Sequence, residues 1–274
     1  MEYILPRNIY KEDGMSFSFC VLASGSSGNC IYVASDTTRL LIDAGLSCRE
    51  TGRRLAEIGG RLEDIQAICL THNHSDHTSG LKVLHARYGV RLYANAGTCD
   101  VLAADQALKP LAWNVFTNGE AFDIGDIRIE PFSVPHDAAD PVGFILEAGG
   151  VRIGIATDIG VPTHLVRERL RSCRALVMEA NHDERLLEQA NRPWSLKQRI
   201  AGRQGHLSNR AAAQMIAEIA GAGLTHVFLA HLSSDCNRPD LALETVRNVL
   251  KDRGHGDIEV KLTHPDRPGE IWSA

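Results

Sequence analysis

The sequence has no hydrophobic run long enough to cross a membrane, and it has no surplus of positive charge. Its formal net charge is −5, so binding to a polyanion must depend on local side chains or on bound metal. The seven cysteines are an odd number, and none lies in Cys-x-x-Cys spacing. This pattern argues against a disulfide framework and for a reducing compartment. The N-terminus also lacks the apolar core of a signal peptide, so we expect a cytoplasmic protein without a membrane partner.

The chain is long enough for one enzyme-sized domain. With 274 residues and 44% apolar content, it can bury a large core without help from disulfides. We expect a single domain over residues 15–274, because Met15 precedes a run that is typical of a first strand. Residues 1–14 are expected to be a disordered extension or a misassigned start. The oligomeric state is open, and a homodimer is one of the states allowed.

The densest group of metal-binding side chains lies in residues 71–80. His72, His74, Asp76 and His77 follow the apolar run 67–70, which is typical of a buried strand. In an extended loop, residues two apart point the same way, so His72 and His74 can reach one ion. Asp76 and His77 can then turn toward a second ion. The alternative, a polar loop with coincidental histidines, explains this pattern poorly because imidazole and carboxylate groups favour borderline divalent metals.

Short apolar or alternating segments alternate with helical segments along the rest of the chain. The expected strands cover residues 17–22, 30–34, 39–42, 91–93, 127–134, 142–147, 151–156, 175–178, 226–229 and 258–262. The expected helices cover residues 47–58, 79–88, 96–104, a segment from 162, 208–220 and 239–250. This order predicts an α/β protein, a four-layer αββα sandwich of two mixed β-sheets. Polar residues at the strand ends should gather along one edge.

Those strand ends supply the remaining ligands for two ions. His136 can complete a first site, His231 a second, and the carboxylate of Asp158 can bridge the two. Five histidines and two aspartates suit Zn²⁺ or Mn²⁺, with Fe²⁺ as a third possibility. Asp43 follows another strand and can accept a hydrogen bond from a metal-bound histidine. Alternatively, Asp43 could cap the helix expected over residues 47–58.

These residues resemble the ordered motifs of the metallo-β-lactamase fold superfamily. Further segments resemble its single-domain YycJ/WalJ group, namely 23–29, 43–45, 136–141, 181–182, 205–209 and 230–233. The resemblance extends from about residue 17 to residue 272. It implies the fold and two divalent metal ions, with Asp76 both a ligand and a catalytic residue. It also implies the activity associated with that group, 5′→3′ exonuclease action on double-stranded DNA, together with mismatch repair.

Phosphodiester cleavage also needs a proton donor for the leaving oxygen. His206 is the candidate acid, and Glu179, at a strand end, could orient it and keep it protonated. This pair resembles the Glu and His motifs of the transfer-RNA 3′-processing nucleases. Alternatively, Glu179 and His182 support the metal site, and His206 only forms hydrogen bonds at a helix start. The same helix start offers Ser208 as a cap.

Substrate contacts are expected at two further places. The small-residue loop 23–29 lets a ligand approach closely through Ser26, Ser27 and Asn29, although a plain turn between strands fits it equally well. Residues 192–210, called here the basic segment, contain no acidic residue. Arg199 and Arg203 could hold phosphates there, and Trp194 could stack on a base. Alternatively, the segment is a solvated face with Trp194 plugging a small core. His182 is a further candidate for substrate binding.

The sequence therefore favours a metal-dependent phosphodiesterase that uses a metal-activated hydroxide, with His206 as general acid. The resemblance implies that this enzyme is a DNA 5′→3′ exonuclease. Double-stranded DNA is the expected partner. The alternative is a small-molecule ester, thioester or lactam hydrolase on the same metals, for which His206 is dispensable. A non-catalytic binding protein is a third reading, but a decayed site would be expected to lose ligands.

Overall fold

The structure is a computed structural model that describes residues 17–106, 108–109, 111–221 and 223–274. The extension expected over residues 1–14 lies outside this range. Within the described residues, fourteen strands form two sheets of seven strands each. No helix in this part of the chain is both long and apolar enough to span a membrane.

The first sheet has the strand order β14-β1-β2-β3-β4-β5-β6. Strands β1 to β3 pair antiparallel, whereas β3 to β6 pair parallel. Its strands are β1 (Ser18–Ala23), β2 (Cys30–Ala34), β3 (Arg39–Ile42), β4 (Ala67–Cys69), β5 (Arg91–Asn95), β6 (Trp113–Phe116) and β14 (Trp272–Ser273).

The second sheet has the order β13-β12-β11-β10-β9-β8-β7. Strands β10 to β13 pair parallel, and β7 to β10 pair antiparallel. Its strands are β7 (Phe122–Ile124), β8 (Ile127–Ser133), β9 (Val142–Ala148), β10 (Val151–Ala156), β11 (Ala175–Glu179), β12 (His226–Ala230) and β13 (Glu259–Leu262). Both sheets are therefore mixed, as the sequence predicted.

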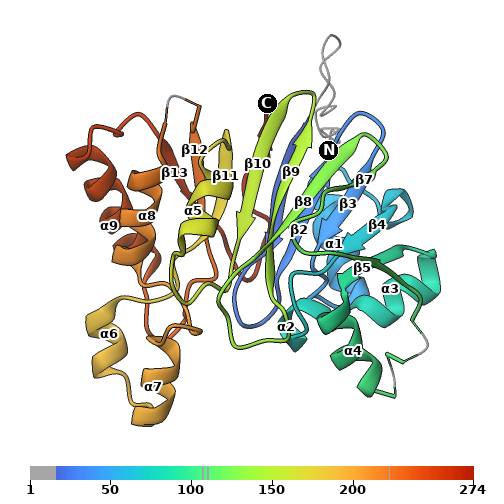
Figure 1. Cartoon of the computed structure of the whole chain (residues 1–274), viewed down its shortest axis with the longest axis horizontal. Coiled ribbons are helices and arrows are strands. Elements are labelled where there is room, and N and C mark those ends of the chain that lie inside the picture. The colour runs from blue at the N-terminus through green and yellow to red at the C-terminus, as the bar shows by residue number, and fades with distance from the viewer. Residues whose placement is uncertain (1–16, 107, 110, 222) are drawn as a thin grey trace, which may run out of the picture.

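Three apolar clusters hold the helices and the two sheets together as layers. One fills the space between the sheets and includes Phe19 from β1 and Phe228 from β12, whose ring centroids are 4.9 Å apart. A second cluster lies between the first sheet and its helices, and a third between the second sheet and its helices. The helices therefore lie outside the paired sheets, as Figure 1 shows. The predicted four-layer αββα sandwich is confirmed.

Helices cover the outer faces of both sheets. Those on the first sheet are α1 (Cys48–Glu57), α3 (Leu81–Tyr88) and α4 (Ala96–Ala104). Those on the second sheet are α5 (His164–Leu170), α8 (Asn209–Ile219) and α9 (Pro239–Asp252). Ser47 caps α1 by accepting a hydrogen bond from Glu50 N, and Ser208 caps α8 by accepting one from Ala211 N. The cap of α1 is therefore Ser47, and the alternative capping role for Asp43 is wrong.

The sequence reading missed several elements that lack a strong apolar period. These are α2 (Ser75–Thr78), a 3₁₀ turn at Leu62–Asp64, β6, β7, β14, α6 (Glu184–Gln189) and α7 (Trp194–Ile200). Strands β7 and β14 contain only three and two residues. Helix α7 buries none of its residues and is only seven residues long, so its two aliphatic residues, Leu196 and Ile200, give too short a pattern to detect. In Figure 1, α6 and α7 project at the same end of the molecule as α2, where the histidine motif lies.

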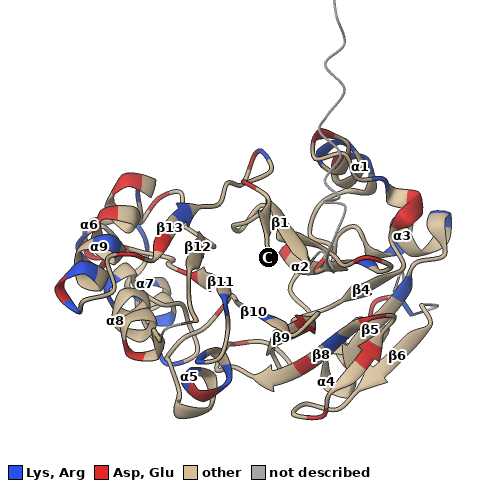
Figure 2. Ribbon diagram, turned by 90° about the horizontal axis from the view of Figure 1, so that it is seen from above, with Lys and Arg blue, Asp and Glu red and all other residues tan. Residues whose placement is uncertain are grey.

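The polar strand ends gather at that same end, as expected. Asp43 follows β3, Asp158 lies just beyond β10, and His231 follows β12. All three have left-handed backbone conformations, with φ of 62°, 55° and 55°. Such conformations cost roughly 1–3 kcal/mol for residues other than glycine and concentrate at functional sites. Both signs of charge are interspersed on the outer helices, as Figure 2 shows.

Candidate metal and catalytic centre

Donor atoms from seven side chains converge where the strand ends meet. One group consists of His72, His74 and His136, and its ligand atoms lie within 4.8 Å of one another. A second group consists of Asp76, His77 and His231, with the same spacing. The seventh side chain, Asp158, joins a third such group with His72 and His77. The structure thus brings together all seven residues that the sequence singled out as metal ligands.

The spacing of these atoms suits ligands of common ions. Two ligands about 2.1 Å from a tetrahedral zinc ion lie roughly 3.4 Å apart. Asp158 Oδ2 is 3.3 Å from His77 Nε2, and Asp158 Oδ1 is 3.4 Å from His231 Nε2 and 3.9 Å from His136 Nε2. The two oxygens of Asp158 therefore face histidines of both groups. This arrangement is what a bridging carboxylate requires.

Several of these atoms lack other partners. His72 Nε2, His231 Nε2 and Asp158 Oδ2 are buried and make no hydrogen bond within the described part of the chain. A buried polar atom without a hydrogen bond costs about 1–3 kcal/mol, so the cluster is poorly stabilised by protein contacts alone. Bound cations would satisfy these atoms. The residues present therefore fit two divalent ions.

Neighbouring groups orient the histidines. Asp43 Oδ2 accepts a hydrogen bond of 2.8 Å from His77 Nδ1, which turns Nε2 of His77 toward Asp76 and Asp158. Asp43 also accepts hydrogen bonds from Thr71 N and Thr71 Oγ1. His136 Nδ1 donates to Gly205 O at 3.1 Å. The supporting role expected for Asp43 thus has the required geometry.

Gly45 packs tightly against the backbone of the histidine-rich segment 71–80. A Cβ atom at Gly45 would lie 1.7 Å from the carbonyl oxygen of Asp76, so a larger residue would push the motif away. A glycine beside Asp43 could serve to supply an unusual backbone angle. Instead, Asp43 itself has the left-handed backbone, and Gly45 allows the close approach of two chain segments.

Burial and charge set the pKa values of the metal-free cluster. Burial lowers the pKa of His72 well below its usual value and keeps this ring neutral, as a metal ligand must be. Burial also lowers the pKa of His77, but Asp43 and Asp158 outweigh it and raise this pKa well above its usual value. Burial raises the pKa of Asp158, but His231 and His77 reverse this effect and lower it. Asp158 therefore stays ionised and attracts cations.

His206 and Glu179 form a close pair at the border of the cluster, and their donor atoms lie within 4.8 Å of those of Asp158 and His231. His206 Nδ1 donates to Glu179 Oε1 at 2.7 Å, which is shorter than the roughly 3.4 Å expected between two ligands of one ion. Glu179 is fully buried, and its Oε2 also accepts hydrogen bonds from Ile159 N and Leu207 N. Burial raises the pKa of Glu179, but His206 lowers it to about 2. Burial lowers the pKa of His206, and the Glu179 carboxylate raises it above its usual value.

Glu179 has a second contact that the sequence did not reveal. Its Oε1 lies 3.3 Å from His231 Nδ1, while Asn181 donates a hydrogen bond of 2.8 Å to His231 O. The same carboxylate thus touches the candidate acid and a candidate ligand. The sequence signal was the position of Glu179 at the end of β11, next to the strand that ends in His231. Both readings of Glu179, orienting His206 and supporting the metal site, are compatible with this geometry.

A cavity of about 250 Å³ opens beside His206. Residues from five parts of the chain line it: Ser26, Asp137, Asn181, Arg192, Leu196, Arg199, Ile200, Gly205, His206, Ser233 and Ser234. Arg199 forms an ion pair with Asp137, whose Oδ1 is 3.4 Å from His136 Nε2. Arg192 forms an ion pair with Asp235. The basic segment therefore borders the candidate centre.

The other predicted substrate contacts have different surroundings. Arg203 lines a neighbouring shallow cavity together with Arg199, and Ser27 is exposed on its loop. Asn29 is buried, with Nδ2 3.1 Å from Asp76 Oδ2 and 2.9 Å from His77 Nε2. His182 is only 3% exposed and lies outside the cavity. Buried side chains cannot reach substrate directly, so we reassign Asn29 and His182 to supporting positions.

Trp194 does not fill a small core, which was one of the two roles expected for it. Its side chain is 68% exposed on α7, so it does not plug a small core. Such exposure is unusual for a large aromatic residue and leaves its face open for stacking. The other basic side chains are partly neutralised, since Arg210 pairs with Glu184 and Lys197 Nζ donates to Glu188 O.

Comparison with known proteins identifies the family. Residues 38–231 match the beta-lactamase superfamily domain. Exodeoxyribonuclease YycJ of Bacillus anthracis is 36% identical, covering 94% of this chain and 99% of that protein. The chain belongs to the beta-lactamase superfamily. Exodeoxyribonuclease WalJ of Streptococcus pneumoniae is 37% identical, covering 92% of this chain and 96% of that protein.

A solved structure of this superfamily has the same fold. The metallo-beta-lactamase fold protein YhfI from Bacillus subtilis superposes with a TM-score of 0.70 at 14% identity, covering 94% of this chain and 100% of that one. Membership in the beta-lactamase superfamily makes the protein a metal-dependent hydrolase and implies divalent metal ions. The resemblance noted in the sequence is confirmed.

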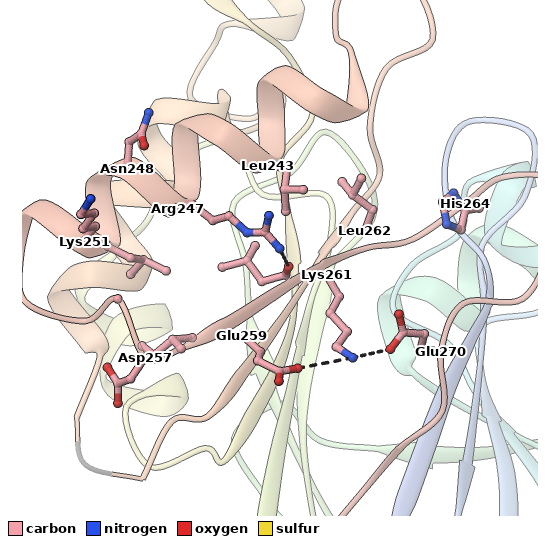
Figure 3. Close-up of a pocket in the computed structure, with 14 residues that line it drawn as sticks. Leu243, Arg247, Asn248, Lys251, Asp257, Glu259, Lys261, Leu262, His264 and Glu270 are labelled. Carbon is pink, nitrogen blue, oxygen red and sulfur yellow. Dashed lines mark hydrogen bonds and ion pairs between the residues drawn. The ribbon is translucent and has the colours of Figure 1, made fainter.

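Another large cavity lies away from the candidate centre. It measures about 760 Å³ and runs between α9 and the edge strand β13 (Figure 3). Arg247 donates a hydrogen bond to Val260 O across it, and Lys261 pairs with Glu259 and Glu270. None of its lining residues belongs to the candidate centre. Its rim carries both charge signs, so it favours no class of ligand.

Proposed function

We propose that the protein is a metal-dependent exonuclease that degrades double-stranded DNA from the 5′ end. The observation that carries this proposal is the His206–Glu179 pair, which lies between the candidate ligands and an arginine-lined cavity. A small ester with a good leaving group does not need such a proton donor, whereas a phosphodiester does. The two relatives named as exodeoxyribonucleases support the same conclusion.

In the proposed centre, His72, His74 and His136 would hold one ion, Asp76, His77 and His231 would hold the other, and Asp158 would contribute to both sites. When bound, Zn²⁺ or Mn²⁺, with Fe²⁺ as a third candidate, would lower the pKa of water to about 7 and stabilise negative charge on phosphate. Asp76 belongs both to the ligand set and to the catalytic set. Asp43 and Asn29 then hold His77 and Asp76 in place.

His206 supplies the proton in the proposed reaction. Because Nδ1 donates to Glu179, Nε2 is left for the substrate. Water adds to phosphorus and releases one proton to solvent, the bond from phosphorus to the 3′-oxygen breaks, and Nε2 of His206 gives its proton to that oxygen. The products are a 5′-phosphate and a 3′-hydroxyl. Glu179 keeps the imidazole oriented and favours its protonated form, as its effect on the pKa of His206 indicates.

The basic segment is proposed to hold the DNA backbone. Arg199 and Arg203 would contact phosphates, Ser26 and Ser27 would contact the strand from the opposite loop, and Trp194 would stack on a base. A cytoplasmic location and a role in DNA repair belong to this proposal. The homodimer allowed by the sequence stays a prediction.

The test is a comparison of substrates with metal-stripped protein reloaded with Mn²⁺ or Zn²⁺. Duplex DNA, the same sequence as RNA, and an aryl ester are offered separately, with an Asp158→Ala variant as a matched control. Metal-dependent degradation of DNA at a rate well above that of RNA is expected. Ester hydrolysis without DNA cleavage, in a preparation that holds two ions per chain, would instead identify a small-molecule hydrolase.

A further inference from the structure

The cavity beside His206, called here the terminal pocket, has the shape and position of a site for one nucleotide. Its volume of about 250 Å³ is slightly below the range of about 300–1,000 Å³ that drug-sized ligands occupy. There is room for a single nucleotide and not for two. We propose that the terminal pocket binds the 5′-terminal nucleotide of the DNA strand, with Arg192 contacting its 5′-phosphate. This inference rests on the proposed function.

The position of His206 decides which side of the scissile bond the terminal pocket serves. A general acid lies next to the leaving oxygen, and in the proposed reaction this is the 3′-oxygen of the departing nucleotide. His206 lines the terminal pocket, so the pocket is on the leaving-group side. For an enzyme that works from the 5′ end, the nucleotide on that side is the terminal one. The first product is then a mononucleotide.

Two arginines line the terminal pocket: Arg199 lies in the last turn of α7, and Arg192 lies just before the N-cap of this helix. Arg199 pairs with Asp137, which neighbours the candidate ligand His136, so Arg199 is close to the metal centre. Arg192 lies seven residues earlier and pairs with Asp235 on the loop after β12. The helical stretch from Trp194 to Arg199 rises about 7.5 Å, and Arg192 lies two residues before it, so the two arginines are separated by more than one phosphate group. Arg192 can therefore bind a phosphate other than the scissile one.

The remaining lining suits the sugar and the base. Ser26, Ser233 and Ser234 offer hydroxyl groups from two loops opposite α7. Leu196 and Ile200 are half-buried on α7 and present an apolar surface to the terminal pocket. The helix has no buried residue, so this apolar face is not needed to attach α7 to the core. A mononucleotide combines the charges, hydroxyl groups and apolar ring that such a lining recognises.

The test compares duplexes whose 5′ ends carry either a phosphate or a hydroxyl group. The specificity ratio is kcat/KM for the 5′-phosphorylated duplex divided by that for the 5′-hydroxyl duplex. We expect a ratio well above one for the unaltered protein, and a fall of roughly 10- to 100-fold in the ratio for Arg192→Ala, as expected when one charge-assisted hydrogen bond is lost. The first products should be mononucleotides by chromatography.

Arg171→Ala is the matched control, because Arg171 is also an exposed arginine in an ion pair, with Glu168 on α5. It should keep the unaltered ratio. A direct measurement adds a second readout: quenching of tryptophan fluorescence by deoxyadenosine 5′-monophosphate should be stronger than by deoxyadenosine, and Arg192→Ala should remove the difference. Arg192→Lys should restore part of the difference in quenching between the two ligands.

The outcomes separate this inference from the proposed function. DNA degradation with no preference for a 5′-phosphate, or with dinucleotides as first products, would overturn the role of the terminal pocket and leave the exonuclease intact. Absence of DNA degradation would overturn the proposed function itself. If Arg192→Ala still binds the 5′-monophosphate in preference to deoxyadenosine, as the unaltered protein does, the assignment of phosphate binding to Arg192 is overturned.

Discussion

Replacement of His206 by alanine separates proton donation from metal binding. The His206 side chain is 22% exposed, and its shortest polar contact is the 2.7 Å hydrogen bond to Glu179. The variant removes the proton donor but none of the seven proposed ligands. The pocket and the bridging Asp158 stay in place. Two ions per chain should therefore remain bound.

The size of the effect depends on the leaving group. General acid catalysis contributes typically about 10²- to 10⁴-fold, or about 2.7–5.5 kcal/mol of transition-state stabilisation. An alkoxide leaving from DNA needs this proton, so kcat on duplex DNA should fall within that range. A nitrophenolate leaves without a proton. On bis(4-nitrophenyl) phosphate, the same variant should lose less than about tenfold.

The assay measures kcat on both substrates and metal content by mass spectrometry, for the unaltered protein and the variant. His226→Ala is the matched control, since His226 also pairs with a glutamate, Glu259, but on the outer edge of the sheet. It should leave both rates and the metal content unaltered. Equal losses on the two substrates, or loss of metal from His206→Ala, would refute the role of His206 as an acid.

Three other substitutions test the supporting contacts. Asp158→Ala should abolish hydrolysis of every substrate and lower the metal stoichiometry below two, because the bridging carboxylate is lost; two retained ions would contradict this. Asp43→Asn should weaken metal affinity about 10- to 100-fold in a chelator competition, because His77 loses its charged acceptor; unaltered affinity would argue against that contact. Glu50→Gln should destabilise the protein by about 1 kcal/mol at pH 7, a value discounted for the exposure of Glu50. Arg53 and Arg54 lower the pKa of Glu50 to about 2, so this difference should be present above pH 4.5 and vanish as the pH falls toward 2 in denaturant titrations; a difference that persists at pH 2 would count against the ion pair.

The sequence predicted those strands and helices whose buried apolar residues recur at regular spacing. The strand over residues 30–34 and the helix over residues 96–104 have the predicted bounds, because apolar residues and turn signals define them. Helix α7 was missed because its Leu196 and Ile200 face a cavity and not the core. The ligand set could be predicted because metal chemistry restricts the residue types and the strand ends converge.

Side-chain partners could not be predicted in the same way, because they depend on how distant segments pack. The contact of Glu179 with both His206 and His231 follows from the pairing of β11 with β12, which no local pattern reveals. The burial of Asn29 and His182 likewise depends on neighbouring loops. The close approach of Gly45 to the Asp76 backbone is a further packing effect of this kind.

The most direct test of the proposed function is a time course on duplex DNA labelled at either the 5′ or the 3′ end. The metal-stripped protein is compared with protein reloaded with Mn²⁺ or Zn²⁺. We predict that the reloaded protein releases the 5′ label at once as a mononucleotide, whereas the 3′ label shortens gradually, and that the metal-free protein does neither. Simultaneous internal cuts, early release of the 3′ label, or no degradation by protein with two bound ions would contradict a 5′→3′ exonuclease.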